Sequence, residues 1–422
     1  MDTFHVRGGR RLQGSVPVSG AKNAVLPIMA AALLADGPVE ILGAPFLRDV
    51  DTFGRLLGQM GAGVERIAPE GGRGGIRVVS RPDLKPEAPY DLVKTMRASV
   101  LVLGPLVARY GRARISLPGG CAIGARPIDQ HLKGLERLGA RTTLTEGYIE
   151  AEAGRLSGAT VTFDLQTVTG TENLMMAATL AQGTTVLKNA AREPEICDLA
   201  KALRAMGARI EGDGTGEIVI HGVPALSGAR HEVMADRIEA ATLLLAGAIT
   251  GGDVTVEGAD PAAMDSVLSK LAESGASVST VSGGVRVLRD GPIRSVNVKT
   301  SPYPGFPTDV QAQFMAYMCL GDGFSIVRET IFENRFMHVA ELRRMGGRID
   351  VSGNTAAVKG VPALSGAPCM ATDLRASASL VLAGLAASGT TEILRIYHLD
   401  RGYESLEKKL SSLGAEIARV QE

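Results

Sequence analysis

The chain has 422 residues, enough for two or three domains with sizeable cores. Its 45 lysines and arginines balance 45 aspartates and glutamates, and a net charge of zero argues against a nucleic-acid or membrane-surface binder. Aromatic residues make up only 4% and tryptophan is absent, which disfavours a platform for stacking bases. We therefore expect no nucleic-acid partner.

The N-terminal residues and the cysteines indicate a reduced compartment. Met1 to Arg7 contain no apolar run of the kind that a signal peptide has. The apolar run from Ala24 to Ala35 is too short to cross a bilayer. The four cysteines are scattered, without the spacing of a zinc site or a disulfide framework. These patterns predict a cytoplasmic enzyme with no membrane partner, no metal and no cofactor.

One unit of sequence recurs six times along the chain. Each copy has an Ala/Leu-rich helix, a Gly turn, a β-branched strand, a second, amphipathic helix and another strand. The second helix of each copy ends at a glycine, where a left-handed conformation turns the chain back into a strand. These glycines recur at intervals of about 70 residues, longer than an ordinary solenoid repeat. They are Gly61, Gly139, Gly207, Gly275, Gly346 and Gly414.

The repeats predict an α/β fold with helices inside and sheets outside. The Ala-rich helices, such as Met29 to Leu34, are apolar nearly all round, which is typical of buried helices. Strands and helices alternate within each copy, so we expect mixed sheets against which the helices pack. The segment 222–228 recurs as 360–366, which predicts one loop used at equivalent places in two copies. Six copies with a break after the third indicate two domains of three copies each.

The first polar cluster along the chain is 19–23, which precedes the first Ala-rich helix. Lys22 and Asn23 follow Gly20 at a helix N-terminus, where the helix dipole and unpaired amide groups favour an anion. The alternative for Lys22 is a surface lysine whose aliphatic stem lies along apolar side chains.

A second cluster lies in the segment 117–129. Cys121 stands between Gly120 and Gly124, with Arg126 and Asp129 close behind. Glycines on both sides disfavour a helix or strand and indicate a surface loop. A nearby cation stabilises the thiolate form of a cysteine on an exposed loop, so Cys121 is a candidate reactive thiol. The alternative is a small apolar residue in a tight turn.

The remaining clusters lie in the second half of the chain. Asp309, in a Phe-Pro-Thr-Asp sequence before a helix, is either a helix N-cap or a general base. Arg375 and Arg401 are either solvated ion-pair partners or binders of phosphate and carboxylate. The sequence has no P-loop, no HExxH and no Rossmann fingerprint. One lysine, several arginines, one aspartate and one thiol suit a small, highly anionic substrate.

At these residues the chain resembles the enolpyruvyl transferases, and most closely those that act on UDP-N-acetylglucosamine. The resemblance covers essentially the whole chain. It implies two inside-out α/β barrel domains, at residues 22–235 and at 1–21 with 236–422, and an active site in the cleft between them. The segments that carry it are 19–27, 118–129, 306–313, 329–338, 372–379 and 400–404.

The resemblance also implies a reaction and its partners. The enolpyruvyl group of phosphoenolpyruvate moves to the 3-hydroxyl of UDP-N-acetylglucosamine by addition and then elimination, and phosphate is released. This is the first committed step of peptidoglycan synthesis. Because the C–O bond breaks, no magnesium ion for phosphoryl transfer is needed.

Residue by residue, the resemblance assigns roles around both substrates. Lys22, Arg126 and Arg401 bind the phosphate and carboxylate of phosphoenolpyruvate. Asp309 takes the 3-hydroxyl proton, and Cys121 protonates the methylene carbon or forms a covalent adduct. Leu165 and Thr169 depart from the family pattern in a segment that contacts the diphosphate. The remaining implied contacts to substrate or intermediate are Asn23, Arg97, Pro127, Ile128, Asp129, Gln130, Thr167, Val168, Ile331 and Arg375.

Three alternatives are weighed against this hypothesis. A shikimate-pathway enolpyruvyl transferase needs a second phosphate site, for shikimate 3-phosphate, and has no use for the loop thiol. A non-catalytic paralogue that binds UDP-sugar is expected to lack one of Lys22, Cys121, Asp309 and Arg401, and all four are present. A nucleic-acid-end cyclase needs a nucleophilic histidine and a basic face, but the six histidines are scattered. The oligomeric state has no signature in the sequence.

Fosfomycin, the epoxide inhibitor of this family, alkylates the loop cysteine, and the chain has cysteine at position 121. We expect saturating fosfomycin to abolish enolpyruvyl transfer, measured as phosphate release after removal of excess inhibitor. A Cys121→Asp variant, which offers no thiol, is the resistant control. Full activity of the treated wild-type protein would contradict this prediction.

Overall fold

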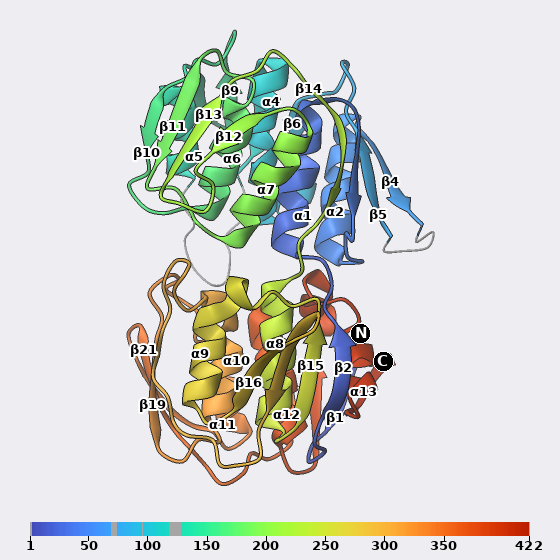
Figure 1. Cartoon of the computed structure of the whole chain (residues 1–422), viewed down its shortest axis with the longest axis vertical. Coiled ribbons are helices and arrows are strands. Elements are labelled where there is room, and N and C mark those ends of the chain that lie inside the picture. The colour runs from blue at the N-terminus through green and yellow to red at the C-terminus, as the bar shows by residue number, and fades with distance from the viewer. Residues whose placement is uncertain (1, 69–73, 95, 118–127, 422) are drawn as a thin grey trace. The chain divides into compact units, whose positions relative to one another are not determined.

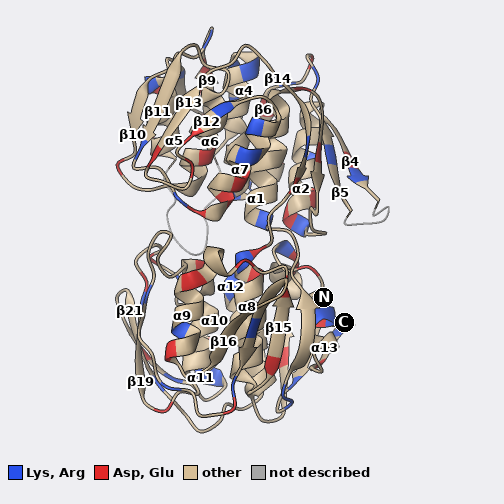
Figure 2. Ribbon diagram, viewed as in Figure 1, with Lys and Arg blue, Asp and Glu red and all other residues tan. Residues whose placement is uncertain are grey.

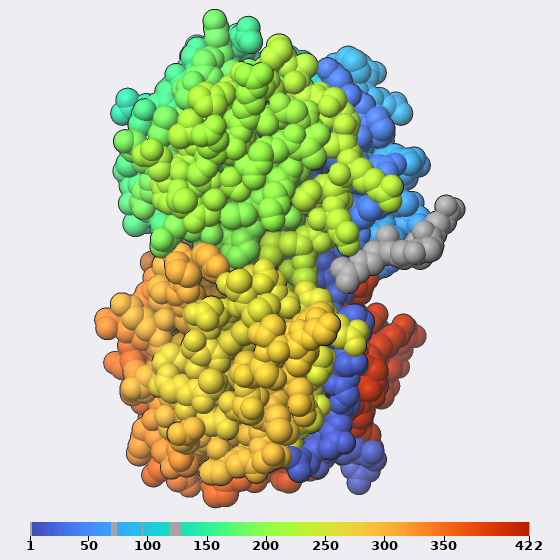
Figure 3. All heavy atoms as spheres, in the orientation of Figure 1, coloured from blue at the N-terminus to red at the C-terminus, as the bar shows by residue number. Residues whose placement is uncertain are grey.

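The computed structural model describes residues 2–68, 74–94, 96–117 and 128–421 (Figure 1). The chain forms two compact units. The described residues between 20 and 234 make up the N-terminal unit, and residues 2–19 with 235–421 make up the C-terminal unit. The first strands of the chain thus belong to the unit that its second half builds, and Figure 3 shows this blue segment on the surface of that unit.

The described residues form six four-stranded sheets, three in each unit, and all six share one pairing pattern. An edge strand pairs in parallel with its neighbour, and the other two pairings are antiparallel. In strand order, the N-terminal unit has β14-β3-β5-β4, β6-β7-β9-β8 and β10-β11-β13-β12, and the C-terminal unit has β2-β15-β17-β16, β18-β19-β21-β20 and β22-β23-β1-β24. This recurrence confirms the six copies predicted from the glycine spacing.

The strands of the N-terminal unit are β3 (Ala35–Leu42), β4 (Gly63–Ile67), β5 (Gly75–Val79), β6 (Glu87–Ala88), β7 (Arg112–Ser116), β8 (Arg141–Thr145), β9 (Tyr148–Glu152), β10 (Thr160–Thr162), β11 (Thr184–Lys188), β12 (Arg209–Glu211), β13 (Glu217–His221) and β14 (Leu226–Glu232). Those of the C-terminal unit are β1 (Asp2–Arg7), β2 (Gln13–Pro17), β15 (Asp253–Glu257), β16 (Ser277–Val281), β17 (Gly284–Leu288), β18 (Val298–Lys299), β19 (Phe324–Arg328), β20 (Arg348–Ser352), β21 (Thr355–Lys359), β22 (Pro368–Met370), β23 (Thr390–Leu394) and β24 (Glu416–Gln421).

Each unit has three inner helices, the Ala-rich ones of the repeats, and three outer, amphipathic ones. The inner helices are α1 (Lys22–Ala31), α4 (Leu103–Tyr110) and α6 (Val168–Ala178), and α8 (Arg237–Ile249), α10 (Gln311–Met318) and α12 (Leu374–Ala386). The outer helices are α2 (Arg48–Met60), α5 (Asp129–Arg137) and α7 (Pro194–Ala205), and α9 (Asp265–Glu273), α11 (His338–Arg344) and α13 (Leu406–Ser412). Shorter helical turns are α3 (Tyr90–Val93) and the 3₁₀ segments η1 (Ala32–Leu34), η2 (Arg97–Val102), η3 (Pro261–Met264), η4 (Thr308–Val310) and η5 (Ile396–Arg401).

The inner helices of the C-terminal unit show why helices lie inside and sheets outside. In α8 and α12 every charged residue lies within the first turn, and α10 has none (Figure 2). A helix without charged residues along its length can be buried among other elements, and all eight residues of α10 are buried. Burial therefore confirms the predicted α/β fold with inner helices and outer mixed sheets.

The six helix-ending glycines adopt the left-handed conformation predicted for them. Their φ angles lie between 93° at Gly139 and 107° at Gly207. The first copy differs in detail from the predicted pattern, because its helix gives way to η1 and strand β3 already begins at Ala35. None of the helices in the described part of the chain has the length and apolarity that a membrane crossing requires.

The two copies of the repeated loop make the same contact in both units. The Gly222 amide donates to the carbonyl of Gly183 and the Val223 amide to that of Thr179. In the other copy Gly360 donates to Gly323, and Val361 to Cys319. A Cβ atom on either loop glycine would lie 1.6 Å from a backbone oxygen, that of Ala181 or of Gly321. The loops are equivalent, as predicted, and each requires glycine because two backbone segments touch.

A Gly360→Ala variant tests this close approach. The added methyl group collides with backbone that cannot yield as a side chain does, so we expect a loss of about 2 kcal/mol in the free energy of unfolding and about 5 °C in Tm. The matched control is Gly291→Ala, whose Cβ would meet nothing within 4 Å. Equal melting temperatures for the two variants would contradict the contact.

Candidate functional site

The predicted site residues gather at the N-terminal ends of helices. In the N-terminal unit, Lys22 and Asn23 open α1, Arg97 opens η2, and Val168 opens α6. The residue before α1 is Ala21, whose side chain cannot cap the helix. Helix N-termini carry partial positive charge, and this arrangement favours anions.

Lys22 is held by a carboxylate that the sequence analysis did not single out. Its Nζ lies 2.9 Å from Oδ2 of Asp49, in the first turn of α2, and the two side chains are 14% and 7% exposed. The alternative of a solvated surface lysine is therefore wrong. The ion pair fixes the ammonium group at the end of α1 and offsets the cost of burying it.

In the C-terminal unit, Asp309 lies between two buried arginines. Oδ1 of Asp309 is 2.8 Å from Nη2 of Arg335, and Oδ2 is 3.0 Å from Nη2 of Arg375. Each arginine side chain is 5% exposed and Asp309 is 26% exposed. Asp309 sits inside η4 and caps no helix, so the N-cap alternative is wrong.

The electrostatics of this triad leave an excess of positive charge. Burial by itself lowers the pKa of the Arg375 guanidinium, but Asp309, Tyr403 and Asp236 together outweigh burial and the pKa is raised. Arg375 is therefore a permanent cation. Among the described residues, the Nη1 atoms of Arg335 and Arg375 are buried and have no hydrogen-bond partner. Two cations with unused donors around one carboxylate suit an anionic ligand.

A buried polar network supports Asp309 from inside the helix bundle. Nε2 of Gln313, on α10, donates to the backbone carbonyl of Asp309 at 2.9 Å and to the Tyr403 hydroxyl at 3.1 Å. The same atom lies 3.2 Å from Oγ1 of Thr242, on α8, which is itself 2.9 Å from the Tyr403 hydroxyl. The Arg375 guanidinium stacks 5.5 Å from the Tyr403 ring. Inner helices α8, α10 and α12 are thus joined at the end that carries the triad.

A second polar network joins three of the predicted elements in the N-terminal unit. Asn173, on α6, donates to the carbonyl of Val100 at 2.6 Å and contacts Nδ1 of His131 at 3.2 Å. Nε2 of His131 lies 3.2 Å from Oγ1 of Thr169, one of the two residues that depart from the family pattern. Burial, with a smaller contribution from Arg97, lowers the pKa of His131 to about 4. His131 is therefore neutral and links α5, α6 and η2.

Two predicted contact residues make hydrogen bonds within the protein. Nε2 of Gln130 donates to Oδ2 of Asp164 at 3.0 Å, and the Asp164 amide donates to Oε1 of Gln130 at 2.9 Å. Oγ1 of Thr167 accepts from the Gly170 amide at 3.2 Å and caps α6. The neighbouring Leu165 side chain is 68% exposed. Substrate binding by Gln130 and Thr167 stays a prediction.

The positions of the remaining predicted residues are as follows. Ile128 and Asp129 lie at the start of α5, and Arg401 ends η5, two residues before Tyr403. Ile331 lies in the turn that follows β19. Cys121, Arg126 and Pro127 lie outside the described residues.

The sequence analysis missed Asp49, Arg335, Glu329 and Tyr403. Arg335 and Glu329 lie inside a segment that carried the resemblance, so their charge in a repeat with few charged residues was an available signal. Asp49 has no such signal, because only the fold brings it to Lys22. Within the described ranges, no three His, Cys, Asp or Glu side chains are placed to hold a metal ion together.

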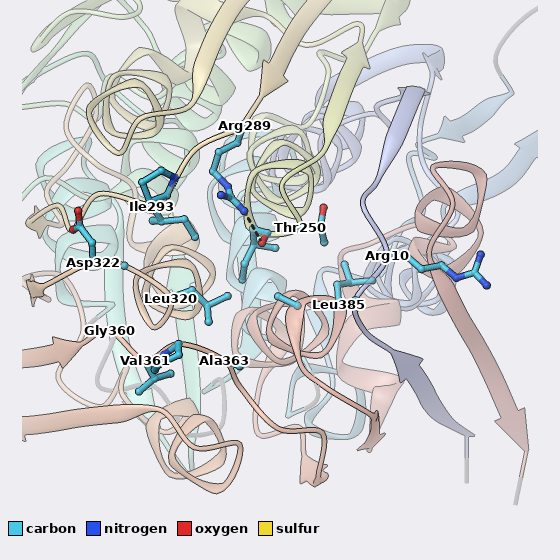
Figure 4. A pocket seen from close by; sticks show the side chains of 16 residues that line it. Arg10, Thr250, Arg289, Ile293, Leu320, Asp322, Gly360, Val361, Ala363 and Leu385 are labelled. Carbon is cyan, nitrogen blue, oxygen red and sulfur yellow. Dashed lines mark hydrogen bonds between the residues drawn. The ribbon is translucent and has the colours of Figure 1, made fainter.

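A cavity of about 590 Å³ lies at the other end of the C-terminal inner helices. Its walls include Ile249, Leu320 and Leu385, at the ends of α8, α10 and α12 (Figure 4). Arg289 donates there to the carbonyls of Ala248 and Ile249 and so caps the last turn of α8. The residues that line this cavity include none of the predicted site residues.

Comparison with known proteins gives a consistent result. Residues 6–410 match the family described as EPSP synthase (3-phosphoshikimate 1-carboxyvinyltransferase). The UDP-N-acetylglucosamine 1-carboxyvinyltransferase of Anaeromyxobacter dehalogenans (strain 2CP-1 / ATCC BAA-258) is 62% identical over 100% of both chains. That of Myxococcus xanthus (strain DK1622) is 59% identical over 99% of both.

Solved structures agree in fold. The enolpyruvyl transferase NikO from Streptomyces tendae is 28% identical and superposes with a TM-score of 0.86 over 99% of both chains. EPSP synthase from Acinetobacter baumannii, at 19% identity and full coverage of both chains, has a TM-score of 0.76 and is similar in fold.

The buried histidines predict how stability depends on pH. The pKa values of His131 and of His338, on α11, are both lowered by burial from 6.5 to about 4. As the pH falls below 6.5, the unfolded chain takes up these protons before the folded protein does. We therefore expect the free energy of unfolding to be highest above pH 6.5 and to fall by up to about 3 kcal/mol per histidine as the pH approaches 4.

Urea denaturation of the wild-type protein and of His131→Gln between pH 7.5 and pH 4.5 measures this effect. The variant is expected to lose part of the acid sensitivity, whereas His221→Gln, on strand β13, should retain all of it. An equal pH dependence in wild type and His131→Gln would show that His131 is not a buried neutral group.

Proposed function

Because the chain belongs to the EPSP synthase family of enolpyruvyl transferases, we propose that it transfers the enolpyruvyl group of phosphoenolpyruvate to the 3-hydroxyl of UDP-N-acetylglucosamine. The observation that carries this proposal is the full-length similarity to enzymes named for that reaction. The product serves peptidoglycan synthesis, and we place the enzyme in the cytoplasm without a nucleic-acid partner.

The reaction consists of an addition and an elimination. In the addition, the sugar 3-oxygen bonds to C2 of phosphoenolpyruvate, its proton leaves to a base, and C3 gains a proton from an acid. In the elimination, C3 loses a proton, the C2–O bond to phosphate breaks, and the double bond returns as phosphate leaves. The reaction therefore needs a base for the 3-hydroxyl proton and a group that exchanges a proton with C3.

The cations of the site suit that substrate. Phosphoenolpyruvate carries about three negative charges, and removing them from water requires paired cations. Lys22 and the amides at the start of α1 form one cationic centre, and Arg401 lies in the other unit. We assign both, with Arg126, to the phosphate and carboxylate, and Asn23 to the reaction intermediate.

Asp309 is the base in this proposal, and its arginines hold it in place. Oδ1 accepts from Arg335 and Oδ2 accepts from Arg375. The two guanidinium groups therefore fix the orientation of the carboxylate.

In this proposal Cys121 is either the acid that protonates C3 or a nucleophile that forms a covalent adduct with phosphoenolpyruvate. The groups on the two units are proposed to serve one pair of substrates, with Arg97, Ile128, Asp129 and Val168 contacting UDP-N-acetylglucosamine.

Phosphate release from phosphoenolpyruvate, with UDP-N-acetylglucosamine or shikimate 3-phosphate as acceptor, tests the proposed function. We expect release with the UDP-sugar alone. Replacing Asp309 by asparagine removes the base and should lower the rate roughly 10²- to 10⁴-fold. The control is Asp350→Asn, a fully exposed carboxylate of the same unit. Release with shikimate 3-phosphate would assign the chain to the other acceptor, and UDP-sugar binding without release from either would indicate a binding protein.

A further inference from the structure

Glu329 is a buried carboxylate directly after strand β19, and it has no part in the reaction described above. Glu329 is 1% exposed. Oε1 accepts hydrogen bonds from the Thr300 hydroxyl at 2.8 Å, the Ile331 amide at 2.7 Å and the Phe332 amide at 3.2 Å. Oε2 accepts from the Thr308 hydroxyl at 2.8 Å.

All four partners of Glu329 are neutral donors. No lysine or arginine in the described part of the chain forms an ion pair with it. A buried carboxylate without a cation is costly and persists only where its hydrogen bonds are complete. Its role is therefore geometric, because Oε1 holds Thr300 and the turn at 331–332, and Oε2 holds Thr308.

One of these segments carries Asp309, the base of the proposed function, and the other carries Ile331, a substrate contact that the resemblance to the enolpyruvyl transferases implies. Thr308 is the first residue of η4 and directly precedes Asp309. Ile331 lies two residues after Glu329, in the turn that leads to Arg335. Since Arg335 also pairs with Asp309, at 2.8 Å, this turn and η4 are joined at two points.

We propose that Glu329 is a positioning residue that fixes Asp309 and the Ile331 backbone in one frame around the sugar. This inference rests on the proposed function. The Ile331 amide is engaged by Glu329, and its carbonyl has no partner among the described residues, so Ile331 offers the sugar an acceptor and no donor. A hydroxyl or amide N–H of the sugar, bonded there, would present its neighbouring hydroxyl to Asp309.

The contacts of the two Glu329 oxygens can be tested separately. Thr308→Val removes only the link to η4, so it should lower kcat about 10²-fold through displacement of Asp309 while leaving the KM for UDP-N-acetylglucosamine within about twofold. Thr308→Ser retains the hydroxyl and should restore kcat.

Glu329→Ala loses both links, so we expect a lower kcat and about tenfold weaker UDP-N-acetylglucosamine binding. Glu329→Gln keeps an acceptor toward Ile331 and should bind the sugar nearly as the wild type does.

The experiment combines phosphate-release kinetics with calorimetric titration of UDP-N-acetylglucosamine into each variant. Glu341→Gln is the matched control, since Glu341 is also largely buried in this unit and accepts from the Met370 amide. Equal kcat for Thr308→Val and Thr308→Ser, or a lowered Tm with unchanged kcat and binding in Glu329→Ala, would overturn the inference.

Measuring UDP-sugar binding separately from phosphate release distinguishes a failure of this inference from a failure of the proposed function. A wild-type protein that binds the UDP-sugar but releases no phosphate would refute the proposed reaction, and the binding of Glu329→Ala would still decide the role of Glu329. A wild-type protein that does not bind the UDP-sugar would overturn both.

Discussion

The burial of three helices in each unit is the constraint on which the rest of the structure depends. A helix surrounded by apolar side chains has no place for charge except at its ends, and the C-terminal unit follows this rule closely. In α8 and α12 the charged residues lie in the first turn, and Asp309 lies in η4, directly before α10. Function is therefore confined to helix ends by the same packing that stabilises the fold.

The two ends of the inner helices differ in chemistry. At the N-terminal ends, the helix dipoles add to the charges of Lys22, Arg335 and Arg375 and favour anions. At the C-terminal end of α8, Arg289 donates hydrogen bonds to the backbone carbonyls of the last turn. The cavity at the C-terminal ends in the C-terminal unit is lined by none of the predicted site residues.

Charges that reach the N-terminal ends are held by contacts between distant segments. Asp309 meets Arg335 and Arg375, Lys22 meets Asp49, and Glu329 joins η4 to the turn after β19. Each of these groups is largely buried, so removing one partner leaves the other without compensation. These contacts therefore fix the charged groups at the helix ends.

The sequence predicts the repeats well because their signals are local. A glycine that ends a helix and an apolar run that must be buried act within one copy, and both are seen in the structure. The loop 222–228 and its counterpart 360–366 were predictable for the same reason. The triad was not predictable, because Asp309 before a helix looks like an N-cap until the fold brings Arg335 and Arg375 to it. Asp49 acts through a tertiary contact alone, and no spacing in the sequence signals it.

A double-mutant cycle on Asp309 and Arg335 tests most directly whether buried charges at the helix ends act as one unit. The free energy of unfolding is measured by urea denaturation for the wild type, Asp309→Asn, Arg335→Gln and the double variant. We expect the double variant to be about 2 kcal/mol more stable than the sum of the two single effects predicts. The reason is that Asp309→Asn alone leaves two buried cations without the carboxylate between them. Single effects that add to within about 0.5 kcal/mol would show that the two charges are independent and would contradict the central role given to this ion pair.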